Sequence, residues 1–184
     1  MRLFVALDFP DAIRVLIRAL VSHLRPLARS TRWVGVEGMH VTLKFIGSVD
    51  EEKFGPIVSA LARVRSKAPV EMRFKGVGFF PNERRPRVCW CGIEASANLP
   101  ELAKEIEQSL LPLGIAREER PFVPHLTLAR FDSPQGLDEL VQKARALESP
   151  DFGATQQTQF HLFESVLKRS GAQYTKLKSF AFAK

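Results

Sequence analysis

Two short stretches of this 184-residue chain pair a histidine with a threonine two positions later. The first is His40-Val41-Thr42-Leu43, and the second, 85 positions further on, is His125-Leu126-Thr127-Leu128. Side chains two apart on a strand share a face, so each stretch would present an imidazole beside a hydroxyl. An imidazole exchanges protons near neutral pH, and a hydroxyl can donate a hydrogen bond to an anionic oxygen. The pattern therefore predicts acid–base chemistry on a charged group.

Both stretches are predicted to be strands, because β-branched and aromatic residues run through them and turn residues follow them. In a regular strand, Val41, Leu43 and Phe45 would face away from the first histidine and pack in the core under helices. By the same alternation, Lys44 would either face the cleft beside Thr42 or lie in solvent at the end of the strand.

The same order of elements recurs around each histidine. Leu3 and Val88 begin strand patterns, and each stands 37 positions before a histidine. The apolar spacing predicts helices over 11–27, 50–66, 99–113 and 137–147, further strands over 31–36, 70–77 and 88–93, and a final hairpin over 160–182 with a turn at Ser170-Gly171.

An offset shared by several elements indicates a repeat. We therefore predict a bilobed α+β fold with pseudo-twofold symmetry, in which two sheets with outer helices surround a central cleft. The chain would form a single domain of two similar lobes, with repeat units of about 1–85 and 86–170 followed by a C-terminal strand. Because equivalent positions face each other across such an axis, both histidines would face the shared cleft.

The composition indicates where the protein acts and on what kind of partner. A formal net charge of +7 and an isoelectric point near 9.8 favour a polyanionic partner. Cys89 and Cys91 are the only cysteines, and we interpret them as reduced core residues. The chain has no signal-peptide layout and no apolar run near the roughly 18 residues of a membrane helix. We therefore expect a cytoplasmic protein without a membrane partner.

A single histidine two residues before a threonine is more often structural than catalytic, but two copies at equivalent places of a repeat favour a functional role. His23 and His161 have no such threonine partner and are expected to be structural or surface residues. In-line displacement at phosphorus needs a base where water attacks and an acid where the leaving oxygen departs. Two histidines can fill both roles, with threonine hydroxyls stabilising the anionic oxygens. This scheme requires no cofactor and no metal, and no third ligand stands at a recognisable spacing.

Further segments carry a resemblance to a known family: Leu3-Phe4-Val5-Ala6-Leu7-Asp8, Arg32-Trp33-Val34, Arg85-Pro86-Arg87-Val88-Cys89-Trp90 and Gly171-Ala172-Gln173-Tyr174. With both histidine stretches, they make the chain similar, nearly end to end, to the 2H phosphoesterases. Within these it resembles the bacterial and archaeal RNA 2',3'-cyclic phosphodiesterases, also named 2'-5' RNA ligases. The resemblance implies hydrolysis of RNA or nucleoside 2',3'-cyclic phosphates to 2'-phosphates, and in some members the joining of tRNA halves by the reverse chemistry.

The resemblance also assigns roles. It implies that His40 is the proton donor to the departing O3', that His125 is the proton acceptor from water, and that Thr42 and Thr127 contact the phosphate. In the family an arginine at the position of Arg130 is implicated in holding the phosphate or the RNA. A regular strand would turn this side chain away from the histidine face, so a bulge or the strand end must redirect it, or it serves structure.

The most basic loop of the sequence carries Arg84, Arg85 and Arg87. These side chains could contact the phosphate backbone of an RNA end, or they could be solvated loop charges. An alternative to the hydrolase is a catalytically idle module that binds RNA ends with the same cleft. Retention of both histidine–threonine pairs favours the enzyme, and we expect it to act as a monomer.

Overall fold

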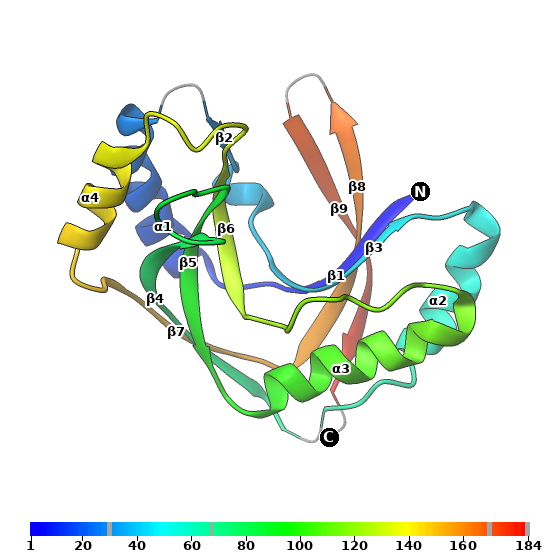
Figure 1. Ribbon diagram of the computed structural model, residues 1–184. Coiled ribbons are helices and arrows are strands. Elements are labelled where there is room, and N and C mark those ends of the chain that lie inside the picture. The colour runs from blue at the N-terminus through cyan, green and yellow to red at the C-terminus, as the bar shows by residue number, and fades with distance from the viewer. Residues whose placement is uncertain (29–30, 67, 169–170, 183–184) are drawn as a thin grey trace.

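The computed structural model describes residues 1–28, 31–66, 68–168 and 171–182 (Figure 1). Its α-helices are α1 (Asp11–Leu24), α2 (Phe54–Leu61), α3 (Asn98–Leu110) and α4 (Asp138–Ala146). Its strands are β1 (Arg2–Leu7), β2 (Arg32–Trp33), β3 (Val41–Ser48), β4 (Val70–Phe80), β5 (Val88–Ala95), β6 (His125–Arg130), β7 (Asp151–Gln157), β8 (Gln159–Lys168) and β9 (Gly171–Ala181). The predicted turn at Ser170-Gly171 falls partly outside the described residues.

The strands form two sheets that face each other, with helices on the outside (Figure 1). One sheet has four strands in the order β3-β1-β8-β9, and the other has five in the order β2-β6-β5-β4-β7. All neighbouring strands are antiparallel. Helices α1 and α4 lie beside the five-stranded sheet, and α2 and α3 lie beside the four-stranded sheet. This arrangement confirms the predicted bilobed α+β fold.

Each sheet draws strands from both halves of the sequence. Strand β4 follows α2 in the first half but pairs with β5, whereas β8 belongs to the second half but pairs with β1. The two lobes therefore differ from the repeat units of about 1–85 and 86–170, because the first unit gives β2 and β4 to the five-stranded sheet and the second gives β8 to the four-stranded sheet. The repeat is clearest where β1 pairs with β3 and β5 pairs with β6, since these two strand pairs carry the histidines.

Buried side chains between the sheets and the helices form the main core. Helix α1 contributes a stripe at helical spacing, namely Ile13, Ile17, Leu20 and Leu24. The apolar pattern also placed Leu16 in this stripe, but its side chain is 47% exposed. A second, small cluster of Phe4, Ala6 and Phe163, with Tyr174 packed on it, lies on the other face of the four-stranded sheet. That face is the one that carries the first histidine.

Prolines explain why two helices are shorter than their apolar patterns. Proline is tolerated only in the first turn of an α-helix, because it has no N–H to donate. Pro56 therefore places the start of α2 at Phe54, with a 3-10 turn before it, and Pro112 ends α3 in a 3-10 turn. None of the described helices is long and apolar enough to cross a membrane.

Two strands differ from the sequence prediction for reasons of composition. Strand β7 was not predicted, because it holds a glycine and several polar residues and lies at the edge of its sheet. The strand expected over 31–36 is only the two residues of β2, and a 3-10 turn, Val36–Gly38, follows it. That turn leads directly to the first histidine.

Candidate active site

The two histidine strands bring their threonines to one cavity of about 500 Å³. His40 stands immediately before β3, and Thr42 follows in the strand. Strand β6 begins at His125, carries Thr127 and contacts β3. The cavity is lined by His40, Thr42 and Thr127, so the structure places three of the four predicted catalytic side chains together.

The fourth side chain, His125, is not part of the cavity lining, but alternation along β6 places it on the same face as Thr127. Its ring packs edge-to-face on Phe80, with ring centres 5.0 Å apart. His40 has a similar aromatic setting, since its ring centre lies 4.2 Å from that of Phe163. Aromatic walls therefore restrict the movement of both imidazoles.

Both imidazoles are held by the same hydrogen bond. Nδ1 of His40 donates to the carbonyl of Gly38 at 2.9 Å, and Nδ1 of His125 donates to the carbonyl of Val123 at 2.8 Å. A carbonyl oxygen can only accept, so Nδ1 keeps its hydrogen in each ring. Nε2 of each ring is therefore the nitrogen left to take up or release a proton.

A β-bulge in each histidine strand redirects the residues that follow. Ala6 pairs with Thr42 and Val5 with Lys44, so Leu43 is an extra residue in β3. Trp90 pairs with Thr127 and Cys89 with Ala129, so Leu128 is the extra residue in β6. The two bulges occupy equivalent positions of the repeat. Each one shifts the alternation by one residue.

The bulge in β6 explains how the side chain of Arg130 reaches the face that carries Thr127. In a regular strand this side chain would face away from Thr127, but the extra residue returns it to the same face. Arg130 accordingly lines the cavity together with Thr42 and Thr127. A guanidinium in this place can bind two oxygens of one phosphate.

The bulge in β3 overturns two predictions for its second half. Phe45 was expected in the core, but its side chain is 46% exposed and lines the cavity. Lys44 was expected in the cleft or in solvent, but it is buried on the opposite face. Its ammonium group donates to Glu107 at 2.9 Å and to the carbonyl of Ala116 at 2.7 Å. Lys44 therefore ties β3 to α3 and to the segment that follows it.

Burial makes both imidazoles weak bases in the free protein. Burial is the main cause that lowers the pKa of His40, to about 4, and the backbone bond to Gly38 and the carboxylate of Asp8 oppose it. Burial also lowers the pKa of His125, and the nearby Arg130 adds to this effect. Both rings are therefore mainly neutral at pH 7. An anionic ligand in the cavity would favour protonation of a histidine beside it.

The arginines of the predicted RNA-binding loop lie away from the cavity. Arg84, Arg85 and Arg87 are all exposed. The backbone amides of Arg84 and Arg85 bond to the side chain of Asn82, and the Arg87 guanidinium donates to the carbonyl of Asp132. Arg87 thus lies beside the end of β6, whereas Arg84 and Arg85 are held to the loop through their backbone amides.

Several cavity residues were not selected from the sequence as site residues. Arg2 lies over the ring of Phe45 at 5.1 Å, and both residues line the cavity. Tyr174 also lines it and contacts the ring of His40 edge-to-face. The resemblance of Gly171-Ala172-Gln173-Tyr174 to the family was the signal for Tyr174, whereas no pattern in the sequence pointed to Arg2, because both residues lie far from the histidines in the sequence.

The remaining histidines and the candidate metal ligands lie outside this arrangement. His161 is buried on β8 and bonds to the hydroxyl of Ser179, and His23 is exposed on α1. Cys89 and Cys91 are buried free thiols, and burial raises the pKa of each to about 12. In the part of the chain that the structure describes, no three His, Cys, Asp or Glu side chains gather closely enough to hold a metal ion.

Comparison with known proteins assigns this arrangement to a family. The model of the 2'-5' RNA ligase superfamily matches residues 9–164, which include both histidine strands. The chain belongs to this superfamily. An RNA 2',3'-cyclic phosphodiesterase from Archaeoglobus fulgidus is 35% identical over 180 residues, covering 98% of this chain and 99% of the relative. The resemblance noted from the sequence is thereby confirmed.

Solved structures of similar proteins agree with the fold. A protein of Thermus thermophilus matches with a TM-score of 0.82 and 31% identity, covering 99% of this chain and 98% of that one. The structure of E. coli LigT with 3'-AMP matches with a TM-score of 0.81 and 29% identity, covering 100% of this chain and 98% of that one. LigT has thus been solved with a nucleoside monophosphate bound.

Proposed function

We propose that this protein hydrolyses 2',3'-cyclic phosphate ends of RNA, or of nucleotides, to 2'-phosphates. The observation that carries the proposal is the duplicated pair of histidine and threonine, held identically through Nδ1, beside one cavity that also holds Arg130. Relatives that match nearly the whole chain are named RNA 2',3'-cyclic phosphodiesterases, which favours an enzyme over an idle module that only binds RNA ends.

The arrangement supports an in-line mechanism with one histidine on each side of phosphorus. Nε2 of His125 takes a proton from water as the water oxygen bonds to phosphorus. The bond from phosphorus to O3' breaks, and Nε2 of His40 gives its proton to that oxygen. Thr42 and Thr127 donate hydrogen bonds to the non-bridging oxygens, whose charge grows in the transition state. Every proton transfer is made by the protein's own side chains, so the proposed reaction is independent of a metal or cofactor.

The cavity also supports a nucleoside as part of the substrate. The ring of Phe45 is exposed beside Thr42, and Arg2 lies on it at 5.1 Å. An exposed ring at the wall of a phosphate site can stack on a nucleobase. Arg130 holds the equivalent place on β6 and offers charge instead of a flat ring. The site would therefore bind the base on one side and the phosphate on the other.

The same geometry would support related steps of RNA end chemistry. If an RNA 5'-hydroxyl replaced water, loss of O3' would leave a 2'-5' phosphodiester, so joining of RNA ends such as tRNA halves is part of the proposal. One chain supplies both histidine–threonine pairs, which supports a monomer. Cytoplasmic location is also proposed, since the buried thiols of Cys89 and Cys91 suit a reducing compartment.

Hydrolysis of adenosine 2',3'-cyclic phosphate, with and without excess EDTA, tests the proposed function. We expect adenosine 2'-phosphate as the product and equal rates in both conditions, because the histidines make both proton transfers. Loss of activity in EDTA that returns with added metal would replace the scheme with a metal-dependent one. Binding of the cyclic phosphate without turnover would instead indicate the RNA-end binding module.

Neutralising the loop by changing Arg84, Arg85 and Arg87 together to glutamine tests whether RNA extends across it. We expect weaker binding of oligonucleotides ending in a cyclic phosphate, and a shallower dependence of that binding on salt, because fewer counterions are released. The rate with a cyclic mononucleotide should stay near that of the unmodified protein, since these side chains lie outside the cavity. Equal effects on both substrates would contradict an RNA path over this loop.

A further inference from the structure

The two halves of the site differ at the residue that lies across from each histidine on the neighbouring strand. Leu7 pairs with Val41, so the next residue of the chain, Asp8, lies beside His40. At the equivalent place on the other strand pair, Gly92 is opposite His125. Resting on the function proposed above, we propose that Asp8 is a positioning residue that favours the protonated form of His40 and thereby fits His40 for the role of general acid.

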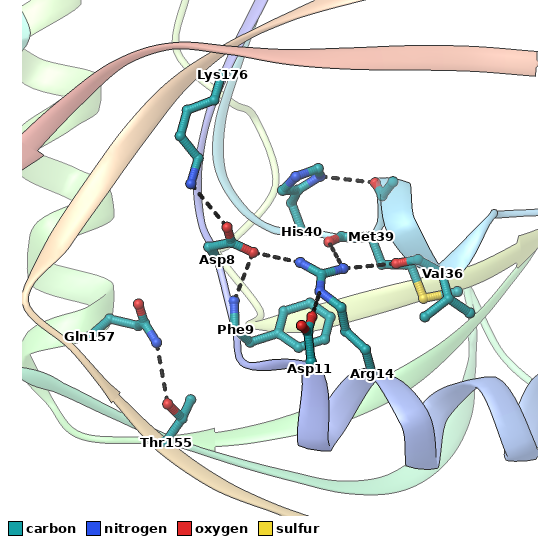
Figure 2. Close-up of polar contacts among 11 residues, drawn as sticks. Asp8, Phe9, Asp11, Arg14, Val36, Met39, His40, Thr155, Gln157 and Lys176 are labelled. Atoms are coloured by element: carbon teal, nitrogen blue, oxygen red, sulfur yellow. Dashed lines mark hydrogen bonds and ion pairs between the residues drawn. The ribbon is translucent and has the colours of Figure 1, made fainter.

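The carboxylate of Asp8 is fixed from both sides (Figure 2). One oxygen accepts hydrogen bonds from the guanidinium of Arg14 at 2.5 Å and from the amide of Phe9 at 2.9 Å, and the other accepts from the ammonium of Lys176 at 3.0 Å. These bonds and charges outweigh the opposing effect of burial and lower the pKa of Asp8. Asp8 is therefore ionised at neutral pH.

Arg14 connects the carboxylate to the turn that orients the imidazole. It is a buried residue of α1, and its other terminal nitrogen, Nη1, donates to the carbonyls of Val36 at 2.8 Å and Met39 at 3.2 Å (Figure 2). The carbonyl of Gly38, which lies between them in the chain, accepts the Nδ1 hydrogen of His40. The position of the ring and that of the nearby negative charge are thus set by the same ion pair.

Among the residues that the structure describes, the second lobe has no counterpart of the Asp8–Arg14 ion pair. A Cβ atom at Gly92 would lie 2.6 Å from the carbonyl oxygen of Lys75, so the position opposite His125 cannot carry a side chain without a backbone shift. The charge near His125 is the cation of Arg130, and it disfavours protonation. A carboxylate acts on His40 and none in the described part of the chain acts on His125, so the two histidines differ although cations lie near both.

The groups around His40 determine the sign of the expected effect. The charged groups that act on it are Asp8 after β1, Arg14 from α1 and Lys176 from β9, and the rings of Phe163 and Tyr174 pack against it. Arg2 of β1 and Arg130 of β6 line the same cavity. Burial lowers the pKa of His40 most, Asp8 is the charge that raises it, and Arg14 and Lys176 lower it further. Removing the charge of Asp8 should therefore lower this pKa, whereas removing the charge of Lys176 should raise it.

The test compares Asp8→Asn with Lys176→Met in single-turnover hydrolysis of adenosine 2',3'-cyclic phosphate at pH 8. Above the pKa of His40 the rate follows the protonated fraction of that ring, which falls tenfold for each pKa unit lost. We expect a rate about tenfold lower for Asp8→Asn, because the charge that favours the protonated ring is lost, and a rate above that of the unmodified protein for Lys176→Met. Apparent substrate affinity should change little in either variant.

A substrate that needs no acid separates this role from simple damage to the fold. Both variants should cleave 3'-deoxyadenosine 2'-(4-nitrophenyl phosphate) at near the unmodified rate, because nitrophenolate leaves without protonation. Equal losses on both substrates would show that Asp8 only supports the structure. A lower rate for Lys176→Met on the cyclic phosphate would contradict the predicted sign.

An NMR titration of the histidine rings in the free protein supplies a measurement that needs no turnover. In Lys176→Met the His40 ring should titrate at a higher pH than in the unmodified protein, and in Asp8→Asn at a lower pH, while His125 keeps its midpoint. An unmoved His40 midpoint, or an equal shift of His125, would overturn the inference. If no cyclic phosphate is hydrolysed by the unmodified protein, the proposed function fails, and the titration still decides whether Asp8 controls the proton on His40.

Discussion

Replacing either His40 or His125 by alanine should lower the turnover of a 2',3'-cyclic phosphate by about 10²- to 10⁴-fold, the usual contribution of a positioned acid or base. Each imidazole presents only Nε2 for proton transfer, because Nδ1 is occupied by a backbone carbonyl. No other histidine can substitute, since His161 bonds to Ser179 and His23 is exposed on α1. The turnover of the double variant should be only slightly lower than that of the less active single variant, because both groups act on one transition state.

The control for these variants is His23→Ala, which removes an exposed imidazole of the same size and should leave turnover unchanged. Circular dichroism and thermal melting would verify that the active-site variants stay folded. Thr42→Val and Thr127→Val keep the shape of the side chain without its hydroxyl, and each should reduce turnover less than loss of a histidine. Near-normal turnover in either His40→Ala or His125→Ala would mean that the two-histidine assignment is wrong.

The fold class could be predicted from the sequence because the repeat is recognisable from the residue types that recur. Histidine, threonine and alternating apolar residues recur at one offset, and two equivalent strand pairs follow from that recurrence. The exchange of β2, β4 and β8 between the lobes was not predictable in the same way. Pairing partners depend on contacts between distant segments, and the local pattern of a strand does not state which neighbour it will have.

The site shows the same limit at the level of single residues. Alternation along β3 and β6 failed after Leu43 and Leu128, because a bulge inserts one residue and no residue type marks it. The predicted faces of Phe45 and Lys44 were consequently wrong. Arg130 lines the cavity because of a bulge, which was one of the alternatives that the sequence analysis named. The bulges explain why an arginine three residues after a threonine can share its face.

Which histidine is the acid is a question that symmetry alone cannot answer, and a change of leaving group should answer it. We expect 3'-deoxyadenosine 2'-(4-nitrophenyl phosphate) to recover most of the loss of about 10²- to 10⁴-fold caused by His40→Ala. Nitrophenolate departs without a proton, so the missing acid no longer matters. The same substrate should recover little of the loss in His125→Ala, because the attacking water still needs its base. Release of nitrophenolate, followed by absorbance, measures both rates directly.

The charges around the two rings predict the same direction. His40 has the carboxylate of Asp8 beside it, whereas His125 has the guanidinium of Arg130. Asp8 favours a proton on the first ring and Arg130 disfavours one on the second, although burial, with Arg14 and Lys176, lowers the pKa of His40 to about 4 in the free protein. Asp8→Asn should therefore lose less rate on the cyclic phosphate than His40→Ala, and the nitrophenyl substrate should recover this loss as well. Recovery of His125→Ala, and not of His40→Ala, by the nitrophenyl substrate would reverse the two roles and leave the paired-histidine mechanism in place.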